Sequence, residues 1–221
     1  MLPVLKGEEI RRRWAGRLLG QIDAAARVRE IVAAVRREGQ AAVERYTREL
    51  DGVDLKEAGL RVTAVEIEAA FKAVSPDLLA AIEKARDNIE AYHRCELKGT
   101  WMETDKTGTI LGQLCRPLQR VGLYVPGGTA AYPSSVLMTA VPARVAGVKE
   151  IALATPPRRD GTIAPLLLVA AAIAGVNEIY KMGGAQAVAA LAYGTEAVAP
   201  VDKIAGPGNI YVTLAKKEVY G

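Results

Sequence analysis

The stretches VGLYVPGG at residues 121–128, EIYKMGGAQ at 178–186 and KIAGPGN at 203–209 decide the fold of this chain. Each begins as a short apolar run typical of a buried strand, ends in a glycine-marked turn, and precedes a helical pattern. A fourth apolar run, at 150–154, has the same character. Strands that alternate with helices predict a mostly parallel sheet with right-handed crossovers. We therefore expect an α/β fold with a Rossmann-like βαβ domain over residues 121–221.

The helices of this domain are expected at residues 134–145, 163–174, 187–193 and 209–219. Before residue 121 the chain is richer in charge, and its apolar residues recur at helical spacing. The elements predicted there are helices at 8–19, 24–37, 41–50 and 76–93, a short strand at 60–63, and a β-hairpin formed by 101–103 and 109–118. We place a domain boundary near residue 120, so that residues 1–120 form an N-terminal helical and α+β portion.

Composition excludes several classes of protein. The 221 residues are 50% hydrophobic with a net charge of +4, which is typical of a globular chain. No block of Lys and Arg with interleaved aromatics indicates nucleic-acid binding. The charged start MLPVLKGEEIRRR lacks the apolar core of a signal peptide, and the most apolar stretch, 163–176, is too short to span a membrane. Cys95 and Cys115 form no CxxC pair, so we expect reduced thiols in a cytoplasmic protein.

The three glycine-rich turns predict a ligand site. Carboxyl ends of parallel strands meet at one edge of a sheet, where α/β proteins bind their ligands beside helix N-termini. We expect Gly127 and Gly128 to let the backbone approach a small anionic or nucleotide-like ligand. Ser134 and Ser135 could bind a phosphate or cap the following helix, and capping is favoured. No G-x-G-x-x-G occurs, so a nucleotide would be held by another arrangement.

Two amide side chains follow these turns. Gln186 could bind an amide or hydroxyl of a ligand, but spacing alone favours a solvated residue in the first helical turn. Asn209 is a natural helix N-cap. His93, the only histidine, is expected at a helix end rather than in catalysis. The pattern reveals no zinc-ligand set and no nucleophile–histidine arrangement, so we assign no catalytic and no metal-binding residue in this chain.

The turn sequences in their order closely resemble those of the histidinol dehydrogenase family. The resemblance is carried by VGLYVPGGTAAYPSSVLMTAVPARVAGV, KMGGAQAVAALAYGT and KIAGPGNIYVTLAKKEVYG, and by IEAYHRCE followed by Trp101. It implies an aldehyde-dehydrogenase-like fold and a cytoplasmic homodimer that contains zinc. It also implies two NAD-dependent oxidations that convert L-histidinol through L-histidinal to L-histidine, the last step of histidine biosynthesis.

The resemblance assigns cofactor contacts to three residues. The tyrosine of the first turn, the glutamine of the second and the asparagine of the third contact NAD in the family, which here are Tyr124, Gln186 and Asn209. The family's zinc ligands, its Glu-His pair and its substrate-binding serine lie beyond the matched sequence. We therefore expect an N-terminal portion that is inactive alone. The alternatives are a non-catalytic nucleotide-binding module and a related zinc- and NAD-dependent dehydrogenase of another small alcohol.

Overall fold

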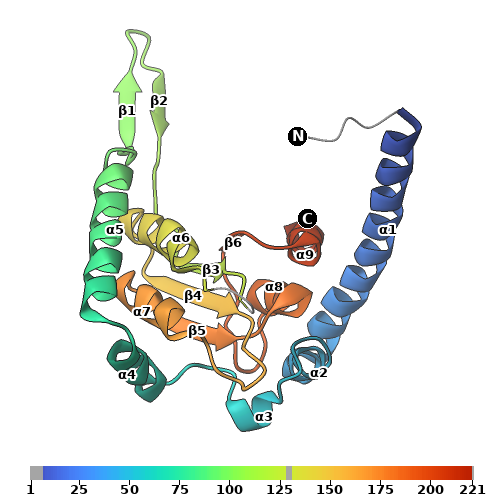
Figure 1. Ribbon diagram of the computed structural model, residues 1–221. Helices are drawn as coiled ribbons and strands as arrows, with labels where there is room; N and C mark the ends of the chain where they lie inside the picture. Colours follow the sequence, from blue (N-terminus) through green and yellow to red (C-terminus); the bar gives the residue numbers. More distant parts are fainter. Residues whose placement is uncertain (1–6, 128–130, 221) are drawn as a thin grey trace.

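The computed structural model describes residues 7–127 and 131–220, with the backbone alone for residues 10–22 (Figure 1). The N-terminal elements are α1 (Gly7–Glu38), α2 (Gln40–Asp51), α3 (Leu55–Ala58), α4 (Ala64–Ala73), α5 (Pro76–Arg94), β1 (Trp101–Thr104) and β2 (Ile110–Gln113). The later elements are β3 (Arg120–Tyr124), α6 (Pro133–Val145), β4 (Glu150–Thr155), α7 (Pro165–Ile173), β5 (Glu178–Lys181), α8 (Gly184–Tyr193), β6 (Lys203–Ala205) and α9 (Ile210–Tyr220).

The predicted parallel sheet is confirmed. Its four strands lie in the order β5-β4-β3-β6, and every neighbouring pair is parallel. From β3 the chain moves outward through β4 to β5 and then returns to place β6 on the other side of β3. The strand order therefore reverses beside β3, and such a switch point opens a crevice at the carboxyl edge of a sheet.

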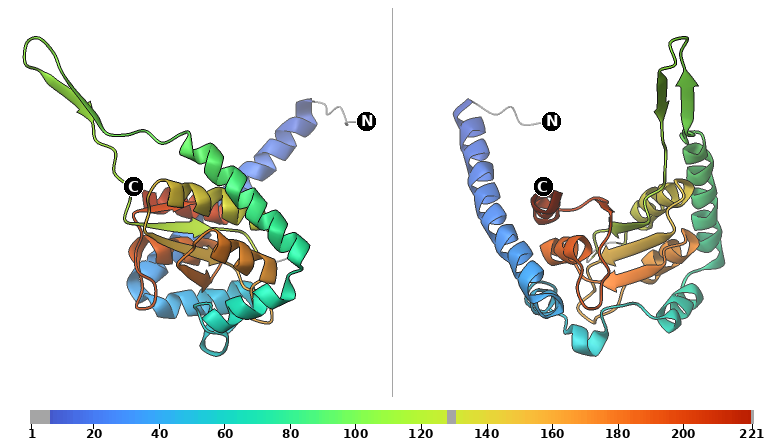
Figure 2. Two further views of the ribbon diagram at one scale, coloured as in Figure 1. Left: turned by 90° about the vertical axis from the view of Figure 1, so that its left-hand side faces the viewer. Right: turned by 180° about the vertical axis from the view of Figure 1, so that it is seen from behind.

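Helices cover both faces of the sheet (Figures 1 and 2). On one face the sheet shares a buried apolar cluster with α4, α5, α6 and α7, and on the other with α1, α2, α8 and α9. Each face has its own buried apolar cluster, and each cluster contains residues from both sides of position 120. The proposed domain boundary near residue 120 stays a prediction, but the apolar cluster on each face is completed by residues from before that position.

Side-chain alternation along the strands assigns residues to the two faces. In β4, Ile151 and Leu153 belong to the cluster beneath α6 and α7, whereas Ala152 and Ala154 belong to the cluster beneath α8. The period of two in a strand points successive side chains to opposite faces. On the α8 side, Gly122 of β3 allows close packing, because an added Cβ there would lie 3.1 Å from the Leu191 side chain of α8.

Several predicted elements differ from the structure. The expected helices 8–19 and 24–37 are one continuous helix, α1, because the residues between them include no proline to interrupt it. The strand expected at 60–63 is wrong, since this segment forms only an isolated bridge between Arg61 and Tyr180. The strand expected at 109–118 ends at Gln113, because its partner β1 offers four residues to pair with.

The helices α3 and α4 were not predicted, although the residues at the start of α4 have the pattern of a helix N-terminus. Thr63 and Glu66 form a capping box, in which the threonine hydroxyl accepts from the Glu66 amide and the carboxylate accepts from the Thr63 amide. The predicted helix starting after Ser75 is confirmed as α5, with the serine as N-cap and Pro76 in the first turn.

Two elements extend beyond the α/β body. The β1–β2 hairpin and the N-terminal part of α1 project from it (Figure 2), and all eight residues of the two hairpin strands are exposed. None of the helices in the described ranges is both long and apolar enough to cross a bilayer.

Candidate functional site

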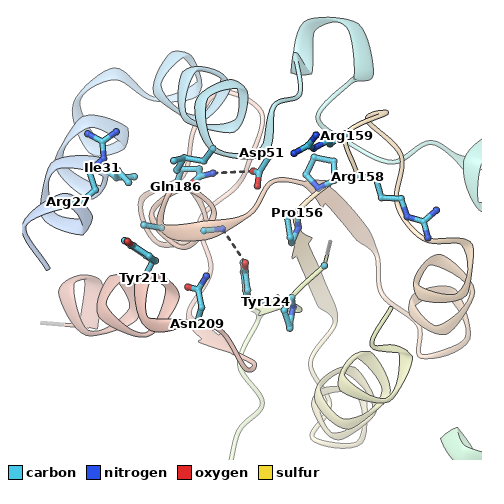
Figure 3. Close-up of a pocket in the computed structure, with 16 residues that line it drawn as sticks. Arg27, Ile31, Asp51, Tyr124, Pro156, Arg158, Arg159, Gln186, Asn209 and Tyr211 are labelled. Atoms are coloured by element: carbon cyan, nitrogen blue, oxygen red, sulfur yellow. Dashed lines mark hydrogen bonds between the residues drawn. The ribbon is translucent and has the colours of Figure 1, made fainter. Parts of the chain in front are cut away.

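A cavity of about 740 Å³ lies at the carboxyl edge of the sheet, where the strand order reverses (Figure 3). It is bordered by α1, the end of α2, and the segments that follow β3, β4, β5 and β6. Its wall consists of Arg27, Ile31, Leu50, Asp51, Tyr124, Pro126, Gly127, Pro156, Pro157, Arg158, Arg159, Gly184, Ala185, Gln186, Asn209 and Tyr211. The three glycine-marked turns therefore meet at one site, as their positions after parallel strands predict.

Tyr124, Gln186 and Asn209 all line this cavity. Tyr124 ends β3, and its buried phenol oxygen accepts a hydrogen bond of 3.2 Å from the Gly184 amide. Burial raises the pKa of this phenol, so the tyrosine stays neutral and keeps its own proton to donate. Asn209 caps α9, because its Oδ1 accepts from the Val212 amide at 3.1 Å. The predicted N-cap is confirmed, and the Nδ2 group of Asn209 is not used by the cap.

Gln186 differs from the interpretation that spacing favoured. It is fully buried in the first turn of α8 rather than solvated. Its Nε2 donates to Asp51 Oδ2 at 3.4 Å, while its Oε1 has no hydrogen-bond partner among the described residues. A buried amide oxygen without a partner carries a desolvation cost of about 1–3 kcal/mol. Such a group is suited to accept a hydrogen bond from a ligand.

The glycines of the turns allow close contacts between strands and turns. A Cβ at Gly127 would lie 2.7 Å from the Pro156 carbonyl oxygen, and one at Gly206 would lie 2.0 Å from that of Tyr124. These glycines therefore allow strands and turns to approach one another. Gly127 also lines the cavity, and its contact with a ligand stays a prediction. Gly128, the other glycine of the first turn, lies outside the described residues.

The capping role favoured for Ser134 and Ser135 is wrong. The N-cap position of α6 is Tyr132, which makes no side-chain capping bond, and α6 begins at Pro133. Proline suits this first position because its missing N–H would have no helical partner. Neither serine belongs to the wall of the cavity.

Asp51 is the functional candidate that the sequence did not reveal. It ends α2, far along the chain from the sheet, and brings a half-buried carboxyl group into the cavity beside Gln186 (Figure 3). Burial raises its pKa to about 6, although a hydrogen bond from the Gly183 amide opposes the shift. Its local sequence, a helix end before Gly52, is typical of any helix C-terminus.

The raised pKa of Asp51 predicts a pH-dependent cost to stability. The folded chain holds this proton up to about pH 6, whereas the unfolded chain releases it near 3.8. Stability contributed by this group therefore falls as the pH rises from about 4 to 6. We expect Asp51→Asn to stabilise the fold at pH 8 and to have little effect at pH 4, as measured by urea unfolding. A gain of equal size at both pH values would contradict the assignment.

Positive charge lies on the side of the cavity that follows β4. Arg158 and Arg159 are both exposed at its wall, and Arg27 of α1 lines it as well. Guanidinium groups bind phosphate oxygens through paired N–H donors. Tyr211, in the first turn of α9, adds an aromatic ring beside Asn209 (Figure 3). The cavity thus combines an anion-attracting wall with amide, phenol and carboxyl groups.

The remaining chemically active residues lie elsewhere. His93 is in the last turn of α5, where it contacts the Glu96 carboxylate, so the predicted helix-end position is confirmed. Cys95 and Cys115 form no disulfide, as predicted. None of these three residues lines the cavity.

The fold and the site together define a class of protein. A parallel sheet with helices on both faces and a polar crevice at its switch point is the arrangement of open α/β proteins, which bind their ligands in such a crevice. The chain belongs to the histidinol dehydrogenase family, whose model matches residues 18–221.

Individual relatives agree with this assignment. The histidinol dehydrogenase of Moorella thermoacetica is 80% identical over 221 residues, which are 100% of this chain and 52% of that protein. That of Heliobacterium mobile is 57% identical over 92% of this chain and 47% of that protein. The crystal structure of histidinol dehydrogenase from Elizabethkingia anophelis has 36% sequence identity and a TM-score of 0.83, and the match covers 99% of this chain and 47% of that one. The chain spans about half the length of the relatives it matches.

Proposed function

We propose that this chain supplies the NAD-binding crevice of a homodimeric histidinol dehydrogenase, which oxidises L-histidinol to L-histidine. The observation that carries the proposal is the convergence of Tyr124, Gln186 and Asn209 in one cavity of about 740 Å³. Family membership supports the reaction and the substrate class. The chemistry that NAD⁺ would supply is that of a hydride acceptor, with one molecule consumed in each of the two oxidations.

The residues of the cavity fit a dinucleotide. Gln186 Oε1 is a buried acceptor without a partner, which suits a hydroxyl or amide donor of the cofactor. The Tyr124 hydroxyl and the Nδ2 group of Asn209 can each donate, because their oxygens already accept from backbone amides. Arg158 and Arg159 supply the positive charge that a diphosphate requires. This chain therefore binds and orients the cofactor.

The described residues do not form a zinc-binding site. Among the residues that the structure describes, no group of three or more His, Cys, Asp or Glu side chains could hold a metal ion. The metal of the proposed enzyme would need ligands other than those described.

Binding of NAD⁺ to the chain tests the proposal. We expect Gln186→Ala and Asn209→Ala each to weaken binding about tenfold, since each removes one hydrogen bond worth about 1.4 kcal/mol within the cavity. Isothermal titration calorimetry measures the change. Asn209→Ala also removes a helix cap, so its fold is checked by circular dichroism.

A matched control is Asn88→Ala, which removes an exposed amide from α5 on the other side of the sheet. It should leave NAD⁺ affinity unchanged. If the control and Gln186→Ala bind NAD⁺ as tightly as the unaltered chain does, the cavity is not the cofactor site.

A further inference from the structure

Asp51 and Gln186 form a pair that the proposed NAD contacts do not explain. The two residues are 135 positions apart, on the end of α2 and the start of α8, yet the Gln186 Nε2 group donates to Asp51 Oδ2 at 3.4 Å. Asp51 is also within reach of the Gly183 amide, at the turn where α8 begins. The carboxyl group therefore contacts the turn and, as Figure 3 shows, the glutamine side chain of that helix.

This contact decides which way the Gln186 amide faces. An ionised carboxylate only accepts hydrogen bonds, so it must face the NH₂ group of the glutamine and not its oxygen. The oxygen is then left as the free end of the amide, and it has no partner among the described residues. Because Gln186 is fully buried, water does not compete for that oxygen as it would at the surface.

We propose that Asp51 is a positioning residue, which holds the Gln186 amide so that its Oε1 faces the cavity as a dedicated acceptor for an O–H or N–H group of the cofactor. This inference rests on the proposed NAD site and deepens it. It makes Gln186 an acceptor rather than a donor, and it assigns Asp51 an indirect role. The cofactor group that meets Gln186 must then carry a proton, as a ribose hydroxyl or a carboxamide NH₂ does.

Protonation of Asp51 should release this arrangement. A neutral carboxyl can donate its own proton to Gln186 Oε1, which consumes the acceptor that the cofactor needs. The pKa of Asp51, raised by burial to about 6, places this change between pH 5 and 7. The other titratable or charged groups of the cavity wall are Tyr124, Tyr211, Arg27, Arg158 and Arg159. Phenol and guanidinium groups ordinarily titrate far above this range.

The first experiment needs no nucleotide. The side-chain amide of Gln186 is identified by nuclear magnetic resonance through the signals that Gln186→Ala removes, and it is followed from pH 5 to 8. We expect its chemical shifts to titrate with a midpoint near the Asp51 pKa of about 6, and that titration to vanish in Asp51→Asn. The matched control Asp87→Asn, an exposed carboxylate of α5, should leave the titration unchanged. The inference would be overturned if the chemical shifts of the Gln186 amide changed neither with pH nor in the Asp51→Asn variant.

The second experiment measures NAD⁺ affinity by calorimetry at pH 5, 6 and 7.5. We expect about tenfold weaker binding at pH 5 than at pH 7.5, no such dependence in Asp51→Asn, and about tenfold weaker binding of Asp51→Ala at pH 7.5. Affinity that rises as the pH falls would show that the carboxylate acts by repelling the anionic cofactor, and would overturn the positioning role. So would wild-type affinity in Asp51→Ala.

The two experiments separate the inference from the function on which it rests. If the Gln186 amide titrates with Asp51 but the chain binds no NAD⁺, the proposed cofactor is wrong and the orientation of the amide stands. If NAD⁺ binds with the losses expected for Gln186→Ala but Asp51→Ala changes nothing, the cofactor site stands and the role of Asp51 is wrong.

Discussion

Replacing Gly206 with alanine is expected to destabilise the fold by about 3–5 kcal/mol, through positive-φ strain combined with steric overlap. Gly206 follows β6 with φ of 116°, a conformation that L side chains rarely adopt. An added Cβ would lie 2.0 Å from the carbonyl oxygen of Tyr124 and within 3.1 Å of its amide nitrogen. These atoms are backbone, so they cannot rotate away as a flexible side chain could.

The same substitution should also disturb the cavity. β6 pairs with β3 as far as Leu123 and Ala205, and Tyr124 is the next residue of β3. Relief of the overlap must separate the two strands at the point where Tyr124 and Asn209 meet the site. We therefore expect NAD⁺ binding to be lost together with stability, even where the variant remains folded.

Urea unfolding monitored by circular dichroism measures the loss. The matched control is Gly99→Ala, because a Cβ there meets no atom within 4 Å and the backbone has no positive φ. Its free energy of unfolding should stay within about 0.5 kcal/mol of the original. Gly206→Ala with the stability of Gly99→Ala would mean that β6 does not approach Tyr124 as described.

Lys181→Met is the second substitution with a large expected effect, a loss of about 3 kcal/mol. Lys181 ends β5 with its side chain 4% exposed, and its Nζ lies 2.6 Å from Glu66 Oε1 of α4. The same ammonium donates to the Ala58 carbonyl of α3 at 2.8 Å. One buried cation thus joins α3 and α4 to the sheet. Methionine has a side chain of similar length but lacks the charge and the hydrogen-bond donors.

The effect of this substitution should depend on pH. Burial raises the pKa of Glu66, but hydrogen bonds from Lys181 and Thr63 outweigh it, and the net pKa lies below the ordinary value of 4.5. A lowered carboxyl pKa contributes stability above pH 4.5, and this contribution is lost as the pH falls through the folded-state value. We expect Lys181→Met to cost less at pH 3 than at pH 7.

A double-mutant cycle with Glu66→Gln checks the pair. The double variant should be less destabilised than the sum of the single variants, because each single change leaves one partner unpaired. Additive losses would show that the two side chains do not interact. Lys72→Met, an exposed lysine of α4, is the control for loss of a charge and should change stability by less than about 0.5 kcal/mol.

Some predictions failed because local patterns are ambiguous. The segment at residues 60–63 alternates as a strand would, but Arg61 forms only an isolated bridge to Tyr180. The serines 134 and 135 have the composition of a cap, but Pro133 begins the helix ahead of them. At 60–63 the surrounding structure rather than residue preference decided the backbone conformation, whereas at the serines the neighbouring proline decided where the helix begins.

The sequence by itself determined the parallel sheet and the meeting of Tyr124, Gln186 and Asn209 at one edge of it. Strand polarity, right-handed crossovers and glycine-marked turns are local features, and together they place every turn after a strand on the same side. Only the tertiary structure decided that Gln186 is buried and that Asp51 is its partner. That pair joins residues 135 positions apart across the packing of α2 on α8, and no local period or propensity reports such a contact.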